Sequence, residues 1–437
     1  MITQTLLYRD IDEPGLNTLA VYERRGGYQA LRKALSMPPE AVLEELLASG
    51  VRGRGGAGFA MGRKVSFLPK GTMDKYLCCN ADESEPGTFM DRELMQKNPH
   101  QLIEGMIIAS YAGGINRAFI YIRGEYALQA DILDAAVEEA RAAGYLGEKI
   151  LGSDLDLSLV VHRGAGAYIC GEETALLDSL EGKRGNPRLK PPFPANQGLY
   201  QGPTLINNVE TLSCVPAILE MGGAEYAKIG AENSTGTKVV SVSGNVQRPG
   251  NYEIELGMKS RDIIYELAGG PPPGREVKFW FPGGSSSPVL KPEDMELPYD
   301  FDSIAKAGSM LGSGAIIVID DSQSVVDVAL WTAEFYKHES CGKCSPCREG
   351  TNWTVKMLER IKAGQATPMD LDIAASVCTN IIGNCLCVLG DAMAMPVGSM
   401  VDKFRPEFEA YIEEARLRSE QAADVPHEPL QVLQGAH

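Results

Sequence analysis

The sequence of 437 residues predicts an α/β core, a small β-rich unit and a bundle of helices, in that order. In the first half, short apolar runs alternate with helical patterns, which is typical of a largely parallel sheet. Near residue 235 the pattern changes to short β-type segments around a single helix. From Val325 onward only helical patterns are found, which favours a bundle. The prediction is therefore a multidomain α/β (α+β) protein.

The segment 1–72 is predicted to be helical and then glycine-rich, with an apolar helix over 38–47. The core domain follows over 73–235. Its predicted elements alternate along the chain as strand 75–80, helix 102–111, strand 118–123, helix 127–143, strand 155–162 and helix 172–180. Pro, Gly and Asn are frequent over 183–208, which predicts a long ordered loop or a lid.

The β-rich unit is predicted over 236–322 and the helical unit over 323–418. The first has strands 238–243, 252–256 and 315–319 and a helix over 260–267. The second has helices over 325–337, 351–363, 369–382 and 399–416, and their short links predict a four-helix bundle. The polar, proline-containing tail 419–437 is predicted to be disordered.

Charge and hydropathy narrow the class of protein. A net charge of −17 and a pI near 4.9 argue against nucleic acid or an anionic membrane surface as the partner. The longest apolar stretch, 102–122, is interrupted by Glu104 and Arg117, so it is too polar to span a bilayer. The first ten residues lack a basic start and a cleavage site. We therefore expect a soluble, unexported protein.

Six of the ten cysteines lie between Cys341 and Cys387. Cys341, Cys344 and Cys347 are spaced at two-residue intervals, and a fourth candidate is distant, which favours an iron–sulfur cluster. Zinc is the main alternative, but structural zinc usually uses paired C-x2-C units. Cys385 and Cys387 compete for the fourth position, whereas Cys378 falls in a helical pattern and is expected to be buried. The remaining cysteines are predicted to be buried free thiols in a reducing compartment, namely Cys78, Cys79, Cys170 and Cys214.

Two glycine-rich loops are candidate ligand sites. The segment 53–58 matches G-x-G-x-x-G, but a helix precedes it and 62–65 does not resemble a helix start. A surface turn and a basic loop that holds phosphates or a flat ring are equally good interpretations. The loop 164–171 leaves a predicted strand and enters a predicted helix, where free N–H groups favour an anion, so ligand binding is preferred over a simple connection.

An acidic turn over 80–87 follows the first predicted core strand. Its carboxylates could accept hydrogen bonds from ribose hydroxyls and would repel a 2′-phosphate, which favours NAD over NADP. The alternative is a solvated acidic turn. Phe59, Phe67 and Phe193 lie beside these loops, where they could stack on planar rings or simply pack. Asn207, Asn208 and Thr211 are expected first to cap a helix and second to contact a ligand.

The chain as a whole resembles the NADH-oxidising flavoprotein subunit of respiratory complex I, the F-type subunit of NADH-quinone oxidoreductase. The resemblance covers nearly the whole length and rests on the segments 52–59, 80–87, 162–174, 188–193, 207–211 and 338–350. It implies a Rossmann-like FMN domain, a ubiquitin-like β-grasp domain and a C-terminal helical bundle with one [4Fe–4S] cluster. It also implies an NADH site stacked on non-covalent FMN.

Carried onto this chain, the resemblance implies specific site residues. Those that would line the flavin and the dinucleotide are Gly53, Arg54, Gly55, Gly56, Ala57, Gly58, Gly62, Lys64, Asn80, Asp82, Glu83, Ser84, Tyr168, Gly171, Glu172, Asn207, Asn208 and Thr211. Those that would hold NADH are Phe59, Phe67, Glu85, Glu173, Lys190 and Phe193, with Glu85 and Glu173 as the catalytic candidates. The family pattern also selects Cys387 as the fourth cluster ligand. The chain departs from the pattern at Val65, in place of Trp, and at 60–61, in place of Pro-Thr.

The predicted reaction is hydride transfer from NADH to FMN, followed by single-electron steps through the cluster to partner proteins. The resemblance implies as partners a [2Fe–2S] thioredoxin-like subunit and the multi-cluster subunit of the peripheral arm, on the cytoplasmic side of the inner membrane. The alternatives are a diaphorase component of a soluble NAD-linked hydrogenase or formate dehydrogenase, a zinc-stabilised binding protein without redox activity, and an NADPH oxidoreductase.

Overall fold

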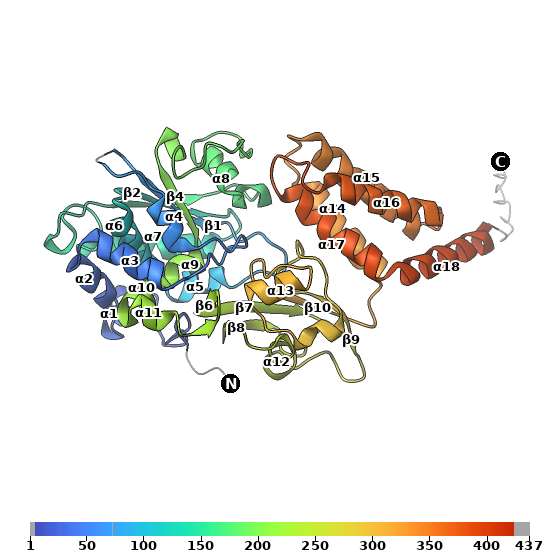
Figure 1. The fold of residues 1–437 in the computed structure, drawn as a ribbon, viewed down its shortest axis with the longest axis horizontal. Helices are drawn as coiled ribbons and strands as arrows, with labels where there is room; N and C mark the ends of the chain where they lie inside the picture. The colour runs from blue at the N-terminus through green and yellow to red at the C-terminus, as the bar shows by residue number, and fades with distance from the viewer. Residues whose placement is uncertain (1–4, 72, 424–437) are drawn as a thin grey trace, which may run out of the picture.

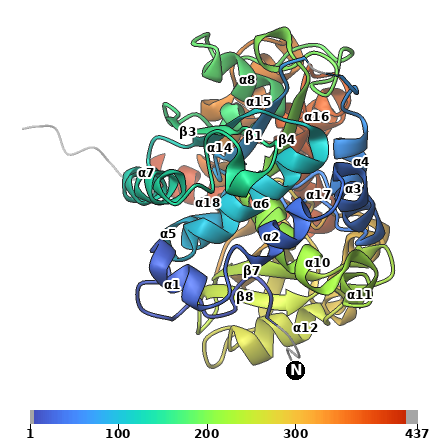
Figure 2. The ribbon, with the colours of Figure 1, turned by 90° about the vertical axis from the view of Figure 1, so that its left-hand side faces the viewer.

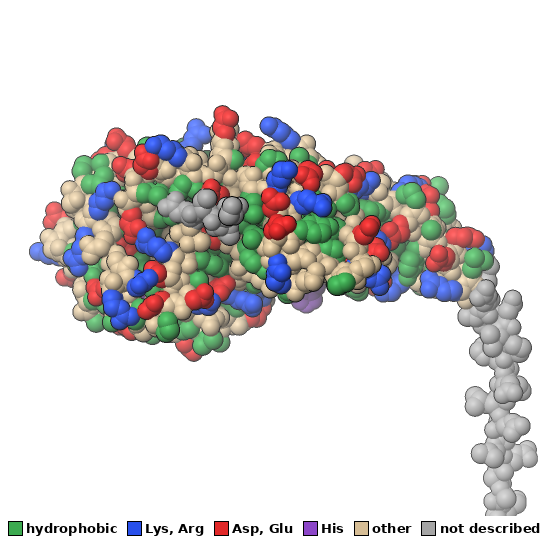
Figure 3. All heavy atoms as spheres, turned by 90° about the horizontal axis from the view of Figure 1, so that it is seen from below, with side chains coloured by type: hydrophobic (Ala, Val, Ile, Leu, Met, Phe, Trp, Pro, Cys, Tyr) green, Lys and Arg blue, Asp and Glu red, His purple; other side chains and the backbone are tan. Residues whose placement is uncertain are grey.

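The computed structural model describes residues 5–71 and 73–423, with side chains up to Arg418. The fold has three parts, seen side by side in Figure 1: an α/β part on the left, a second sheet below it, and helices on the right. Seen from below, the molecule is elongated, with a broad end and a narrow helical end (Figure 3). Acidic and basic side chains are interspersed on the face in Figure 3.

The first sheet has four parallel strands in the order β3-β2-β1-β4. The strands are β1 (Tyr76–Ala81), β2 (Arg117–Ile122), β3 (Ser158–Arg163) and β4 (Thr204–Asn208). The first three confirm the predicted strands. The fourth corrects the prediction of a loop or lid over 183–208, because β4 pairs with β1 and buries its apolar residues Leu205 and Ile206.

Helices cover both faces of the first sheet. The helices of this part are α5 (Asp91–Lys97), α6 (Pro99–Gly113), α7 (Ala127–Ala142), α8 (Glu173–Leu180) and α9 (Val209–Ser213). Two more, α10 (Val215–Met221) and α11 (Gly223–Tyr226), pack on α6 and on the N-terminal helices. Helix α6 is buried on every side over residues 99–110, because the sheet and the N-terminal helices enclose it. Figure 2 looks onto this layer, with α2 and α3 beside α6.

The N-terminal helices are α1 (Leu19–Arg24), α2 (Gln29–Leu35), α3 (Pro39–Ala48) and α4 (Met61–Ser66). Helix α3 confirms the predicted helix over 38–47. Helix α4 corrects the expectation that 62–65 does not begin a helix. Its Gly62 lies so close to α3 that an added Cβ would come within 2.8 Å of the Leu47 backbone nitrogen. The short helix is therefore held by tertiary packing rather than by its own sequence preference.

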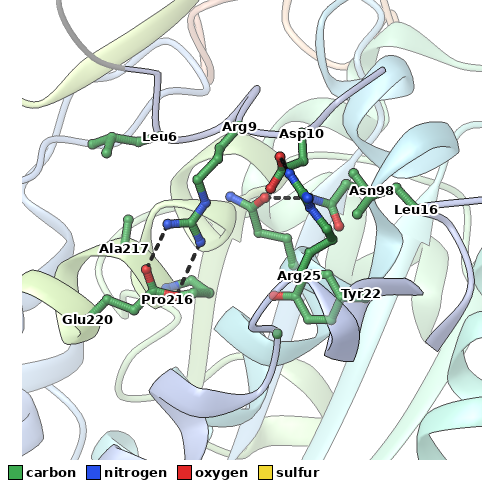
Figure 4. A pocket seen from close by; sticks show the side chains of 12 residues that line it. Leu6, Arg9, Asp10, Leu16, Tyr22, Arg25, Asn98, Pro216, Ala217 and Glu220 are labelled. Atoms are coloured by element: carbon green, nitrogen blue, oxygen red, sulfur yellow. Dashed lines mark hydrogen bonds and ion pairs between the residues drawn. The ribbon is translucent and has the colours of Figure 1, made fainter. Parts of the chain in front are cut away.

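The segment before α1 is fixed by a buried carboxylate of the second sheet. Glu253 accepts hydrogen bonds from the backbone N–H groups of Leu6, Leu7 and Tyr8 at 2.7–2.9 Å. Next to it, Arg9 pairs with Glu220 through both guanidinium nitrogens at 3.1 and 3.3 Å (Figure 4). The cavity beside this pair has a volume of about 20 Å³, which is room for about one water molecule and too small for a nucleotide.

The second sheet has the order β8-β7-β10-β9. Its strands are β7 (Thr237–Gly244), β8 (Gly250–Glu255), β9 (Val277–Phe281) and β10 (Ala315–Asp320), and a short hairpin, β5 (Gly230–Ala231) with β6 (Ser234–Thr235), precedes them. Strands β7, β8 and β10 confirm the prediction, while β9 and helix α13 (Phe301–Lys306) were not predicted. The predicted helix over 260–267 begins as α12 (Ser260–Asp262) and continues as a wider π-type turn over 263–267.

Five helices follow: α14 (Val325–Glu339), α15 (Ser345–Lys362), α16 (Pro368–Ile381), α17 (Leu389–Lys403) and α18 (Arg405–Ala423). The first four pack together, and α18 extends from them (Figure 1). The single helix predicted over 399–416 is wrong: the helix is interrupted at Phe404, because Pro406 has no N–H to donate to the carbonyl of Asp402 and instead stands in the first turn of α18. The helix then continues to Ala423, and the rest of the predicted disordered tail lies outside the described residues. None of the helices within 5–71 and 73–423 is long and apolar enough to cross a membrane.

Candidate functional site

The carboxyl ends of the parallel strands bring most of the predicted site residues to one edge of the first sheet. Asn80 near the end of β1 is in register with Asn208 at the end of β4. The Asn80 side chain also donates a 2.8 Å hydrogen bond to the Gly171 carbonyl, which ties the second glycine loop to the same edge. This edge is where open α/β sheets bind their ligands.

The first glycine loop is anchored to the start of α9. The Arg54 backbone N–H donates to the Thr211 hydroxyl at 2.8 Å, and a Cβ at Gly55 would lie 2.8 Å from the Cβ of Asn208. The Arg54 guanidinium is buried and donates to the carbonyl oxygens of Thr235 and Thr237 at 2.8 and 2.9 Å. The loop backbone therefore lies at the sheet edge, whereas the Arg54 side chain points into the fold.

Two asparagines at the end of β4 differ in how their amides are used. The Asn208 side chain caps α9 by accepting from the Thr211 N–H at 3.2 Å and donates to Asp91, so the predicted helix cap is confirmed. The Asn207 amide nitrogen is buried and has no protein acceptor. A buried donor without a partner is costly, so this position suits a ligand with acceptor oxygens or nitrogens, as FMN has.

The second glycine loop ends in a 3₁₀ turn (Tyr168–Gly171) that leads into α8. Glu172 caps this helix by accepting from the N–H groups of Thr174 and Ala175, both at 2.9 Å. Lys190 bridges Glu172 and Glu173 at 3.1 and 2.5 Å. Burial lowers the pKa of Lys190, but these two carboxylates outweigh burial and the net shift is upward. The lysine is therefore firmly cationic beside the predicted dinucleotide site.

The acidic turn after β1 is not a solvated turn. Burial raises the pKa of Asp82 to about 7, although the Ser84 hydroxyl and Arg123 partly offset the shift. Burial likewise raises the pKa of Glu83 to about 7, and its carboxylate accepts from the N–H groups of Asp91 and Arg92 at the start of α5. Glu83 therefore caps the start of α5.

Glu85 joins all three parts of the fold. Its carboxylate accepts from the Tyr168 hydroxyl at 2.7 Å, from the Ser286 N–H of the second sheet unit at 2.8 Å and from the Tyr336 hydroxyl of α14 at 3.3 Å. Burial raises the pKa of Glu85, and these donors counteract part of the rise. Gly284 must lack a side chain here, because a Cβ would come within 2.6 Å of the Glu85 side chain.

The three predicted ring-stacking phenylalanines are exposed rather than packed in the core. The exposed fractions are 41% for Phe59, 55% for Phe67 and 55% for Phe193, and the rings of Phe59 and Phe67 lie 6.0 Å apart. Lys64, on α4, donates to the Ile206 carbonyl of β4 at 3.2 Å, and burial lowers its pKa. Exposed aromatic rings, one of them directly after the helix that carries the half-buried Lys64, suit a planar, partly anionic ligand.

The predicted cluster thiols gather where α14, α15 and α17 meet. The Cys347 sulfur shares a 3.1 Å hydrogen bond with the Ser340 hydroxyl, and Cys341, Cys344 and Cys387 lie in the same cluster of side chains. Burial raises the pKa of Cys347 to about 11 and that of Cys387 to about 12. Within residues 5–71 and 73–423 no three such side chains are already set in metal-ligand geometry. The donor set itself fits iron–sulfur chemistry, because the four predicted thiols belong to one cluster of side chains.

Cys385 belongs to the same group, because its sulfur lies in the space that Gly390 leaves open beside Cys347, so both candidates for the fourth position lie in it. Cys378 is 2% exposed and lies in α16, as predicted. The four isolated thiols are buried as well, which confirms the prediction for Cys78, Cys79, Cys170 and Cys214.

The thiol group adjoins the second glycine loop. Glu339, just before the cysteine run, accepts from the Tyr168 N–H at 3.1 Å, and Lys343 within the run donates to the Pro187 carbonyl at 2.6 Å. Arg184 reaches the Cys341 carbonyl at 3.5 Å. These contacts hold the sheet edge and the thiols side by side, as electron transfer between two centres requires.

A parallel sheet with a nucleotide-type edge beside a thiol centre defines a flavin- and nucleotide-binding iron–sulfur protein. Residues 46–217 match the family described as the Nuo51 FMN-binding domain, residues 239–289 the SLBB domain, and residues 327–411 the NADH-ubiquinone oxidoreductase-F iron-sulfur binding region. The chain belongs to the family of F-type subunits of NADH-quinone oxidoreductase.

Individual relatives agree over almost the full length. The chain is 53% identical over 415 residues to the F-type subunit numbered 2 of the NADH-quinone oxidoreductase of Rhizobium meliloti, covering 94% of this chain and 99% of the relative. It is 52% identical over 418 residues to the F-type subunit of the same enzyme from Mycobacterium tuberculosis (strain H37Rv), covering 93% of each. A crystal structure of an NAD+-reducing [NiFe]-hydrogenase in the air-oxidized state superposes with a TM-score of 0.81 at 34% identity, over 95% of this chain and 70% of that chain.

The family confirms the predicted fold class, the FMN and [4Fe–4S] cofactors and the activity, which is NADH oxidation through FMN and iron–sulfur. It also makes the chain one component of a multi-subunit NADH-quinone oxidoreductase. A zinc-stabilised protein without redox activity is overturned by the iron–sulfur region that spans the cysteine run.

Several residues around the site were not predicted. They are Asp91, Tyr126, Ser286, Tyr336 and the buried pair Glu210–Lys238. The run Gly-Gly-Ser-Ser-Ser over 283–287 was the one available signal, since small residues mark a close approach of backbone. The others sit inside ordinary helical or strand patterns and carry no local mark.

Proposed function

We propose that FMN binds along the carboxyl edge of the first sheet and that NADH stacks against it from the side of the exposed phenylalanines. The supporting observation is that the sheet edge and the thiol group are joined directly, through Tyr168 to Glu339 and through Lys343 to Pro187. Electrons that arrive as a hydride at the sheet edge can then pass to the adjacent thiol group.

The flavin contacts in this proposal come from four segments. The loop 53–58 with Lys64 lies along one side, and the orphaned Asn207 amide donates to the flavin. The remaining polar contacts are assigned to Asn80, Asp82, Ser84, Tyr168, Gly171, Glu172, Asn208 and Thr211. Glu83 is assigned an indirect role, because its carboxylate holds the start of α5.

When bound, FMN accepts two electrons as a hydride and returns them one at a time, which links NADH to a one-electron iron–sulfur centre. The chain's own residues position the two ring systems and balance their charge. Phe59, Phe67 and Phe193 offer ring faces for stacking, and Lys190 supplies positive charge held by Glu172 and Glu173. A hydride passing between stacked rings needs no protein acid or base, so Glu85 and Glu173 are proposed to orient NADH or the groups around it.

The iron–sulfur cluster is proposed to be held by Cys341, Cys344, Cys347 and Cys387. From there electrons would leave to a [2Fe–2S] thioredoxin-like subunit and to the multi-cluster subunit of the peripheral arm, on the cytoplasmic side of the inner membrane. The relatives are named as subunits of an NADH-quinone oxidoreductase, which supports the presence of partner subunits.

The test is anaerobic purification of the chain, measurement of bound FMN and iron, and EPR before and after addition of NADH. One FMN, four irons and a cluster signal that NADH elicits are expected. Protein that binds neither FMN nor iron, or a cluster that dithionite reduces and NADH does not, would contradict the proposal. Faster reduction by NADPH than by NADH would contradict the assignment of acidic groups to the ribose.

A diaphorase role beside a hydrogenase is the second candidate, supported by the 34% identical hydrogenase structure. The two roles differ in what copurifies. Isolation of the native complex from membranes with NADH-driven quinone reduction supports the first, whereas a complex that reduces NAD+ with H2 supports the second.

A further inference from the structure

The second sheet unit contains a cleft that the proposed function does not use. Its volume is about 400 Å³, at the lower end of the range of about 300–1,000 Å³ that is typical of small-molecule sites. Three segments line it: the helix that begins as α12, the start of β9 and the 3₁₀ turn Pro292–Glu296. In Figure 1, α12 and β9 lie in the lower part of the molecule, below the first sheet. None of the residues that line the cleft is assigned to the flavin, to NADH or to the cluster.

The walls of the cleft are fixed by contacts that need no ligand. The Glu276 N–H donates to the Asp321 carboxylate at 3.3 Å, and the Asp321 N–H donates to the Glu276 carbonyl at 3.0 Å, which joins the start of β9 to the end of β10. Beside the 3₁₀ turn, the Lys291 N–H donates to the Asp294 carboxylate at 2.9 Å, and the Lys291 carbonyl accepts from the Trp280 indole at 3.2 Å. The cleft is therefore preformed, as small-molecule sites usually are.

The buried part of the cleft is apolar and includes an aromatic ring. Val277 and Met295 line it and are themselves buried. Tyr265 lies in the π-type turn over 263–267, a rare conformation that is frequent at functional sites. An added Cβ at Gly270 would come within 2.7 Å of the Tyr265 ring, so the backbone at this position lies against the ring and holds it. This surface suits a flat, largely apolar group.

Two arginines that line the cleft keep their donors available. The Arg261 guanidinium carbon lies 4.8 Å from the centre of the Tyr265 ring, a cation–π contact that holds the side chain in place. The nearby carboxylates are beyond hydrogen-bond range, with Glu296 at 3.7 Å from Arg261 and Asp321 at 3.8 Å from Arg275. In the part of the chain that the structure describes, neither guanidinium donates a hydrogen bond. The planar fork of N–H donors on an arginine matches a phosphate or a carboxylate.

Two glutamates also line the cleft and narrow the class of ligand. Glu276 and Glu293 are exposed there. Their charge opposes the binding of a bare anion such as inorganic phosphate, and their oxygens can accept hydrogen bonds from hydroxyl groups. A ligand that uses the whole lining therefore carries an anionic group for the arginines, a flat ring for the apolar surface and hydroxyl groups for the glutamates.

We propose that this cleft binds a nucleoside monophosphate. The phosphate meets Arg261 and Arg275, and the base lies on the apolar surface beside Tyr265. The ribose hydroxyls donate to Glu276 and Glu293. A volume of about 400 Å³ favours a mononucleotide over a dinucleotide. The site does not depend on the proposed electron-transfer reaction, because it shares no residue with it.

The test is isothermal titration calorimetry of AMP against the full chain holding its FMN and cluster. Arg261→Ala and Arg275→Ala should each weaken AMP binding by about tenfold, because each removes a charge-assisted contact with the phosphate. The KM for NADH should stay unchanged in both variants. Arg117→Ala is the matched control, since Arg117 is also half-exposed, has a long ion pair with Asp74 at 3.5 Å and lies at the start of β2, outside the cleft. It should leave AMP binding unchanged.

Adenosine and inorganic phosphate are titrated in parallel, and both should bind more weakly than AMP. Wild-type chain that does not bind AMP, or AMP binding that neither arginine variant weakens, would overturn the inference. Inorganic phosphate that binds as tightly as AMP would also overturn it, because the cleft would then be a simple anion site. A raised KM for NADH in the arginine variants would place these arginines at the dinucleotide site instead. Failure of the proposed function would show separately, as missing FMN or as a cluster that NADH does not reduce.

Discussion

Removing the Glu85 carboxylate should loosen the junction between the three parts of the chain. In Glu85→Ala the Tyr168 hydroxyl and the Ser286 N–H lose their acceptor, while the Tyr336 hydroxyl keeps its contact with Ser285 at 2.8 Å. Each buried donor left without a partner costs about 1–3 kcal/mol, which gives about 2–6 kcal/mol for the pair. The alanine variant no longer bears the cost of burying a carboxyl group, which offsets part of this, so we expect a net loss of about 3 kcal/mol in the free energy of unfolding.

The assay is thermal unfolding of the chain at fixed FMN concentration, followed by intrinsic fluorescence, because bound cofactor shifts the midpoint. A cooperative unit of 150–250 residues loses about 2–4 °C for each kcal/mol, so about 6–12 °C is expected. The exposed Glu232→Ala is the control and should change stability by less than about 0.5 kcal/mol. A Glu85→Ala variant as stable as the control would refute the reasoning.

Glu85→Gln adds a pH test of the same junction. Burial raises the pKa of Glu85 above its ordinary value of 4.5, so between these two pKa values the folded chain holds more protons than the unfolded chain. Stability of the wild type therefore falls as pH rises through that interval. Glutamine does not titrate, so the stability advantage of the wild type over Glu85→Gln should shrink as pH rises above 4.5. An advantage that grows over this range would show that the carboxylate, not the acid, is the preferred form.

Three further predictions concern the buried ion pair, the stacking site and the cluster. Glu210→Gln leaves the fully buried Lys238 ammonium without its carboxylate and should lower the free energy of unfolding by about 3–5 kcal/mol. A double variant that also carries Lys238→Met should recover part of this loss, and equal stability of Glu210→Gln and wild type would contradict the prediction. Phe67→Ala removes a side chain that is 55% exposed, so the stability of the chain should change little. The KM for NADH should rise about 2–10-fold, because about 0.5–1.5 kcal/mol of stacking is lost, and an unchanged KM would place NADH elsewhere. Cys387→Ala should lose cluster iron and its EPR signal yet keep FMN, and full iron retention would remove Cys387 from the ligand set.

Local sequence patterns predicted the elements that consist of a short apolar run or of an amphipathic helix. Strands β1, β2 and β3 and helices α3 and α7 each carry an apolar pattern bounded by turn residues, so their prediction did not depend on the rest of the chain. Strand β4 was missed because its five residues lie after a proline-rich segment, and its pairing with β1 is what makes it a strand. Helix α4 was missed for a similar reason, since its packing against α3 decides its conformation.

The site was predictable in its residue types and only partly in their roles. The spacing of Cys341, Cys344 and Cys347 is visible in the sequence because all three ligands come from one short segment. The acidic turn is different: Glu83 and Glu85 are two residues apart, yet one caps α5 and the other receives a donor from residue 286, 201 positions away. No local pattern distinguishes two such carboxylates, because their environments are built by distant parts of the chain.

The position of Glu85 explains how one chain can keep two redox centres in a fixed relation. The thiol group belongs to the helical part and the flavin edge to the first sheet, so their separation depends on contacts between these parts. Tyr168 makes one of those contacts, since its N–H donates to Glu339 beside the cysteine run, and Glu85 holds Tyr168 from within the first part by accepting from its hydroxyl. Electron transfer weakens steeply with distance, so a looser junction would slow cluster reduction even with both cofactors bound. Glu85 should therefore affect the rate at which NADH reduces the cluster more than the affinity for NADH. Rapid-freeze EPR of Glu85→Gln can separate the two effects. A slower cluster signal with an unchanged rate of flavin bleaching supports the structural role, whereas slower bleaching alone places Glu85 at the NADH site.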